Sequence, residues 1–128
     1  MTFNFSRQLV GLALVAGAVA VSSPSLADPS GTWLRDNGNS RVRVAPCGDA
    51  ICGTIVWLKD ADTPSKVGQR VFFDMKPNGE NKWSGKAFNP EDGKTYSGTM
   101  TLAGRNLTTS GCVLGGIICR SVSWSKVN

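Results

Sequence analysis

Alternation of apolar and polar residues with period two is the feature that most constrains how this chain folds. It recurs from Gly31 to Val127 in short runs separated by turn residues. The run from Lys94 to Leu102 is the clearest, because its apolar residues and its threonines and serines occupy opposite parities. In a β-strand, successive side chains point to opposite faces. The sequence therefore predicts antiparallel strands with one face in a core and the other in water.

About eight short strands are predicted, and no helix. Their ranges are Gly31 to Asp36, Arg41 to Val44, Ile51 to Leu58, Arg70 to Met75, Asn81 to Asn89, Lys94 to Leu102, Asn106 to Val113, and Ile118 to Lys126. Interior glycines at Gly85, Gly98 and Gly111 predict bends where the sheet curves on itself. Short sequential connections with such bends favour a small all-β, up-and-down antiparallel barrel over a sandwich.

The first 27 residues have the pattern of a cleaved signal peptide. Arg7 is the only charged residue there, and an apolar run of 13 residues follows from Leu9 to Val21. Such a run is too short to span about 30 Å of hydrocarbon as a retained helix. Small residues before the junction of Ala27 and Asp28 predict cleavage there. We expect residues 28–128 to form a single periplasmic or secreted domain without a transmembrane anchor.

All four cysteines follow the predicted signal peptide, and disulfides persist in the compartments that exported proteins reach. Four cysteines allow three pairings. We expect Cys47 to pair with Cys52 and Cys112 with Cys119, because each pair flanks glycine and closes a short hairpin-like loop.

The chain contains no histidine, which excludes Ser-His-Asp and Cys-His catalytic arrangements. Its cysteine spacings differ from C-x-x-C, and disulfides are favoured over a four-cysteine zinc site. With no phosphate-binding loop either, we expect no cofactor, no metal and no catalysis. A carboxylate-based hydrolase remains an alternative, although each acid pair is explained more simply as turn or loop residues. These pairs are Asp60 with Asp62, Asp74 with Glu80, and Glu91 with Asp92.

Positive charge is spread along the predicted mature chain. It has 13 Lys and Arg residues against 9 Asp and Glu residues, which gives +4, and the cations do not cluster. This indicates at most a weak affinity for anionic envelope lipids or glycans. An exported protein without a basic-aromatic stripe is not expected to bind nucleic acid.

Several short motifs resemble a bacterial exported domain-of-unknown-function family with a lipocalin-like barrel. They are Gly31-Thr32-Trp33, Cys47-Gly48, Cys52-Gly53-Thr54-Ile55-Val56-Trp57-Leu58, Trp83-Ser84-Gly85, Asn89-Pro90-Glu91-Asp92-Gly93-Lys94-Thr95-Tyr96, Gly111-Cys112-Val113, and Cys119-Arg120 through Trp124. Their order covers nearly the whole predicted mature domain. The resemblance implies the barrel and an envelope location, but its members have no agreed activity.

The same motifs predict structural roles at one end of the barrel. Gly31 allows a tight chain crossing, and Trp33 places an indole at the closed end. Lys126 shares strand parity with Trp124, and the lipocalin resemblance implies that this cation covers Trp33. Stacking of a cation on an indole stabilises it by about 0.5–2 kcal/mol.

Four residues are candidates for binding a ligand. Trp57, Trp83 and Tyr96 are large aromatics on strands, for which core packing is the simpler role and cavity lining the alternative. Arg120 shares parity with the apolar face of its strand, and beside Cys119 it could lie at the barrel mouth and hold an anionic headgroup.

Our leading hypothesis is an exported module that binds or carries a small amphipathic or anionic ligand. The first alternative is an envelope structural or adaptor domain that binds a protein or the cell wall through its exterior. An exposed apolar patch rather than an internal pocket would favour that alternative.

Overall fold

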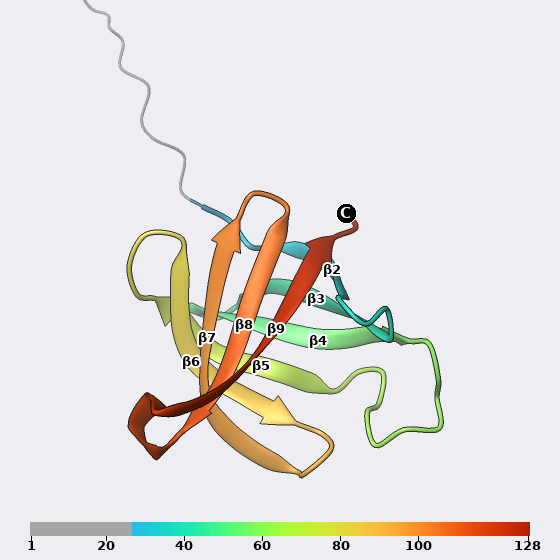
Figure 1. The fold of residues 1–128 in the computed structure, drawn as a ribbon. Coiled ribbons are helices and arrows are strands. Elements are labelled where there is room, and N and C mark those ends of the chain that lie inside the picture. The colour runs from blue at the N-terminus through green and yellow to red at the C-terminus, as the bar shows by residue number, and fades with distance from the viewer. Residues whose placement is uncertain (1–26) are drawn as a thin grey trace, which may run out of the picture.

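The computed structural model describes residues 27–128, in which eight antiparallel strands close into a barrel (Figure 1). The predicted signal peptide, apart from Ala27, lies outside these residues. The strands are β2 (Gly31–Arg35), β3 (Ser40–Cys47), β4 (Ala50–Leu58), β5 (Arg70–Pro77), β6 (Lys82–Asn89), β7 (Lys94–Ala103), β8 (Asn106–Val113) and β9 (Ile118–Lys126). One short 3₁₀ turn, η3 (Leu114–Gly116), connects the last two strands.

Each strand pairs with its neighbour in sequence, and β2 pairs with β9 to close the sheet. The beginning and end of the barrel domain therefore lie side by side (Figure 1). The predicted all-β, up-and-down barrel is confirmed. The main difference between predicted and observed strand limits is in β3, which was predicted to end at Val44. It continues to Cys47 because Ala45 and Pro46 pair with residues of β4.

The period-two alternation of the sequence corresponds to side chains that point alternately into the barrel and out to solvent. In β7, Gly98 and Met100 are buried, whereas Ser97 and Thr99 are exposed. The buried side chains of all strands meet in one core, whose members are Trp33, Val42, Val44, Ile55, Val71, Phe72, Met75, Trp83, Met100, Leu107 and Trp124. Full burial of a large apolar side chain stabilises a fold by about 1.5–3 kcal/mol.

One end of the barrel is filled and closed. Trp33 is almost fully buried there, and its indole Nε1 donates a hydrogen bond of 2.8 Å to the carbonyl of Pro29. The Nζ atom of Lys126 lies 5.9 Å from the Trp33 ring centroid. Gly31 has φ of +140°, and a Cβ atom there would lie 2.6 Å from the carbonyl oxygen of Asn128. A side chain at this position would thus obstruct the crossing of the chain ends.

The predicted glycine bends differ in how tightly they are packed. Asp74 adopts φ of +55° where the register of β5 and β6 shifts, and a Cβ at Gly85 would collide with the Asp74 backbone. At Gly98 a Cβ would lie 2.9 Å from Met75 Cε. At Gly111 the nearest atom would be Tyr96 Cβ at 3.5 Å, an ordinary contact. Close approach therefore requires glycine at the first two positions but not at Gly111.

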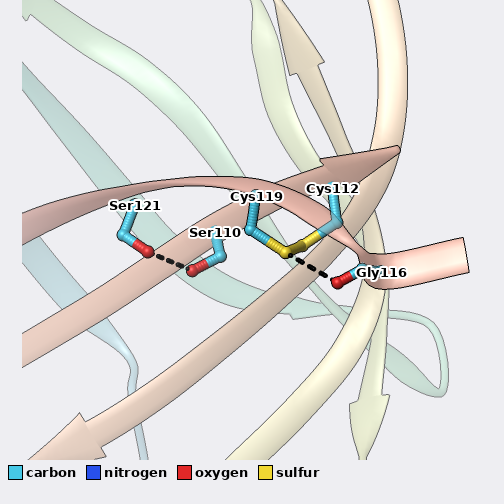
Figure 2. Close-up of a disulfide and its surroundings, with 5 residues drawn as sticks. All are labelled: Ser110, Cys112, Gly116, Cys119 and Ser121. Carbon is cyan, nitrogen blue, oxygen red and sulfur yellow. Dashed lines mark hydrogen bonds between the residues drawn. A yellow bond between two sulfur atoms is a disulfide. The ribbon is translucent and has the colours of Figure 1, made fainter. Parts of the chain in front are cut away.

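Two disulfides each join neighbouring strands, at opposite ends of the barrel. Cys47 bonds to Cys52 in the β3–β4 hairpin, and Cys112 bonds to Cys119 in the β8–β9 hairpin (Figure 2). These are the two pairs predicted from the sequence, and such bonds are compatible with a location outside the cytoplasm.

In the part of the chain that the structure describes, no helix is long and apolar enough to cross a membrane.

Candidate functional site

A cavity of about 500 Å³ lies in the half of the barrel opposite Trp33. Strands of an up-and-down barrel alternate in direction, so the β2–β3, β4–β5, β6–β7 and β8–β9 connections share one end. Residues next to or within all four connections line the cavity, including Ser40, Ser65, Pro90 and Ile118. Ligand pockets typically measure about 300–1,000 Å³, so this space suits a small molecule.

Apolar side chains from four strands form the floor of the cavity. Val42, Ile55, Val71 and Phe72 contribute from β3, β4 and β5, and Trp124 contributes from β9. The rings of Phe72 and Trp124 meet edge to face, with centroids 6.0 Å apart and an angle of 81° between the planes. Offset and edge-on pairs of this kind are favoured by the charge distribution of aromatic rings.

Arg35 is the cation that lies deepest in the wall of the cavity. It is half-buried at the end of β2, and its Nε atom is buried without a hydrogen-bond partner. Its direction follows from strand parity, because Trp33 points into the barrel and Arg35 lies two residues further along. The prediction from sequence missed Arg35, although the Gly31-x-Trp33-x-Arg35 spacing contained this information.

Tyr96 and Asp92 form a hydrogen-bonded pair at the rim. The Tyr96 hydroxyl donates to the Asp92 carboxylate, which also accepts the backbone N–H of Lys94 at 2.9 Å. The bond from Tyr96 lowers the pKa of the Asp92 carboxyl, and the Lys94 amide adds to this effect. The same bond raises the pKa of the Tyr96 hydroxyl. The pair therefore fixes the β6–β7 turn beside the mouth.

Only two of the four predicted ligand-binding residues line the cavity. Tyr96 lies at its rim, and Arg120 lies on β9 as an exposed rim cation. Trp83 is buried in the closed half instead, where it pairs with Met100 across β6 and β7. Its position corresponds to core packing, the simpler of its two predicted roles.

Trp57 lies on the outer surface, so both of its predicted roles, core packing and cavity lining, were wrong. Its side chain is 38% exposed, and the Arg41 guanidinium stacks 4.9 Å from its ring centroid. Ile55 pairs with Val42 while Trp57 pairs with Arg41, so β4 has one extra residue between these pairs. Such a bulge reverses the alternation, which turns Trp57 outward although it shares parity with Ile55.

The paired carboxylates all lie on exposed segments. Asp60 accepts the N–H of Asp62, and Asp92 accepts that of Lys94, as acids in turns commonly do. Asp74, Glu80 and Glu91 are likewise exposed. These positions give no support to the hydrolase alternative. Within residues 27–128, no three Cys, Asp or Glu side chains gather as metal ligands.

Comparisons with known proteins agree with this architecture. No curated protein matches the sequence. Among solved structures, the chain is similar to protein HP1028 from Helicobacter pylori, which is described as belonging to the lipocalin family. The two share 15% sequence identity at a TM-score of 0.64, over 81% of this chain and 85% of that one. The model of the bacterial family described as "Uncharacterized protein conserved in bacteria (DUF2147)" matches residues 31–126, and the chain belongs to that family.

Proposed function

We propose that this protein is an exported module that binds or carries a small amphipathic molecule in its barrel cavity. The observation that carries the proposal is the combination of a 500 Å³ cavity, an apolar floor and a few polar groups near its mouth. Ligand pockets generally have this composition, because apolar walls supply affinity and a few polar groups fix orientation. The closed half of the barrel is filled with side chains, so the ligand enters from the open end.

The floor supplies the driving force for binding. An apolar chain that covers Phe72 and Trp124 removes its own surface and theirs from water, at about 25 cal/mol for each Å² buried. Part of this gain offsets the lost freedom of the ligand. Since the β-strands already hold these rings in place, little further ordering of the protein accompanies binding.

Three features support an exported carrier. The first 27 residues have the composition of a cleaved signal peptide. Both disulfides lie in short hairpins, as in proteins of oxidising compartments. The fold is shared with a protein described as a lipocalin.

Native mass spectrometry of the mature protein from the periplasm of its host tests this function. We expect a bound small molecule in the wild type. Val122→Phe places a larger side chain in the cavity wall and is expected to exclude that molecule. Ser123→Phe adds a ring to the next residue of β9, which faces outward, and is the matched control. A wild-type protein that carries nothing and takes up no amphiphile from an envelope lipid extract would refute the carrier function.

A second candidate function is an adaptor that binds another envelope protein through the tip of the β8–β9 hairpin. Four apolar residues are exposed there, with Leu114 at 68% and Ile117 at 83% between Val113 and Ile118. Exposed apolar clusters commonly mark interaction surfaces. A photo-crosslinker at Ile117 should then label one defined protein, and the Leu114→Ser change should abolish labelling without affecting ligand content. Labelling that does not depend on Leu114 would count against this candidate.

A further inference from the structure

We propose that the ligand of the cavity carries an anionic group, such as a carboxylate, and that Arg35 binds it. This inference rests on the proposed ligand-binding function and specifies its substrate class. It also moves the expected anion contact from Arg120 at the rim to a residue deeper in the wall.

The surroundings of Arg35 leave its charge without a protein partner. Its Nε–H is buried and donates a hydrogen bond to no acceptor in residues 27–128. Within the same residues, the one ion pair within 4.0 Å joins Lys76 on β5 to Asp49 in the β3–β4 turn, and both side chains are exposed. A buried donor without a partner costs free energy, and native proteins rarely retain one. A carboxylate that binds the outer N–H groups of the guanidinium from the cavity would supply the missing countercharge.

The acids nearest the mouth do not meet this requirement. Asp92 is occupied by the Tyr96 hydroxyl and the Lys94 amide, and Glu91 is exposed. Arg120 is exposed too, so water and salt screen its charge more strongly than that of the half-buried Arg35. Arg35 is therefore the cation with the greater influence on an anion inside the cavity.

The position of Arg35 also suits an amphiphile. In the β2–β9 ladder it is directly opposite Trp124, whose ring forms part of the apolar floor. A guanidinium presents N–H donors in a planar fork that matches a carboxylate. An anionic head at Arg35 thus places the attached apolar chain next to Trp124 and Phe72. A neutral head can accept one hydrogen bond but lacks the charge that strengthens such bonds.

Calorimetric titration with decanoate and decan-1-ol tests the inference, because the two probes share a chain and differ in charge. We expect the full-length mature protein to bind decanoate about tenfold more tightly than decan-1-ol. This ratio of dissociation constants corresponds to the difference in free energy between a charged and a neutral hydrogen bond. Arg35→Gln should remove most of this preference and leave decan-1-ol binding nearly unchanged. Arg120→Gln, which removes the rim cation, is the matched control and should retain the preference.

The outcomes separate this inference from the proposed function. Binding of both probes without preference, or a preference abolished by Arg120→Gln but not by Arg35→Gln, overturns the role of Arg35 while the carrier function stands. Binding of neither probe overturns the inference, and uptake from the envelope lipid extract then decides the carrier function separately. If Arg35→Gln fails to fold, the NMR resonance of the Arg35 Nε–H in the wild type tests whether Arg35 binds the anionic head. It should shift more with decanoate than with decan-1-ol, and equal shifts overturn the inference.

Discussion

The indole Nε1 of Trp124 donates a hydrogen bond of 2.9 Å to the hydroxyl of Thr109, and both residues line the cavity. Both side chains are buried, at 6% and 4% exposure. They lie on adjacent strands, β9 and β8, but are not directly opposite, since Thr109 pairs with Val122. The bond satisfies the polar atom of an otherwise apolar ring. It therefore holds Trp124 in the orientation in which its ring meets that of Phe72.

Replacing Thr109 by valine keeps the shape of the side chain and removes the acceptor. The buried indole N–H is then left unsatisfied, which costs about 1–3 kcal/mol. We expect urea unfolding to show this loss. Thr108→Val, on the exposed face of the same strand, should change stability by less than about 0.5 kcal/mol. Equal effects of the two changes would show that the bond does not stabilise the floor.

Gly98→Val is expected to destabilise the barrel more than Thr99→Val. A Cβ at Gly98 would lie 2.9 Å from Met75 Cε and 3.0 Å from the backbone of Lys86 and Ala87. Overpacking of this kind costs about 1–3 kcal/mol, whereas Thr99 is exposed. Denaturant melts of both variants measure the difference. Equal stabilities would show that the strands tolerate a side chain at this crossing.

Gly111→Ala tests why the curved strands contain interior glycines. Either neighbouring atoms lie too close for a side chain, or the curved backbone itself needs glycine. Its added methyl group would contact Tyr96 at an ordinary distance of 3.5 Å. We expect this change to cost less than Gly98→Ala in the same denaturant melts. A larger loss at Gly111 would mean that backbone flexibility, rather than packing against neighbouring atoms, explains the interior glycines.

Strand positions could be predicted because they follow from local chemistry. β8 and β9 have the limits predicted, since alternation is strong there and the turn between them contains Gly115 and Gly116. The short hairpins also identified both disulfide pairs. The closing contact between β2 and β9 joins residues far apart in sequence, so no local pattern contains it. That contact was anticipated only from interior glycines and from the family resemblance.

The site was less predictable, because it depends on the direction of single side chains. The extra residue in β4 turns Trp57 outward, and neither glycine nor proline marks this bulge. The spacing of Arg35 to Trp33 could have predicted that its side chain points into the barrel. An arginine at the end of a short strand is, however, usually expected to be exposed to solvent. The cavity volume could not be predicted from the sequence, since it depends on how side chains from all strands pack together.

Removing the Cys112–Cys119 disulfide is expected to cost about 2–5 kcal/mol. The two cysteines are directly opposite in the β8–β9 ladder, and the Ser110 and Ser121 hydroxyls meet at 2.7 Å two residues away (Figure 2). The double change Cys112→Ser with Cys119→Ser leaves no free thiol, and thermal unfolding compares it with the wild type. A Cys47→Ser and Cys52→Ser variant serves for comparison. Free thiols in the oxidised, denatured wild type would contradict the pairing.

The Asp92–Tyr96 pair predicts how pH affects the rim. A carboxyl whose pKa is lowered on folding stabilises the fold above its unfolded-state pKa and loses this contribution as pH falls through its folded-state pKa. A tyrosine whose pKa is raised contributes below its unfolded-state pKa and loses this as pH rises through its folded-state value. The hydrogen bond should therefore make its full contribution to the β6–β7 turn between about pH 4 and pH 10, the unfolded-state values, and lose it progressively outside that range.

Tyr96→Phe tests this relationship directly. Without the hydroxyl, the largest cause of the lowered pKa is gone, so the pKa of Asp92 should rise towards its ordinary value. Carboxyl ¹³C NMR titrations of the wild type and the variant measure the change. The remaining bond from the Lys94 amide should keep part of the shift. An unchanged Asp92 pKa in Tyr96→Phe would mean that the backbone of the turn, rather than Tyr96, sets the charge of the rim.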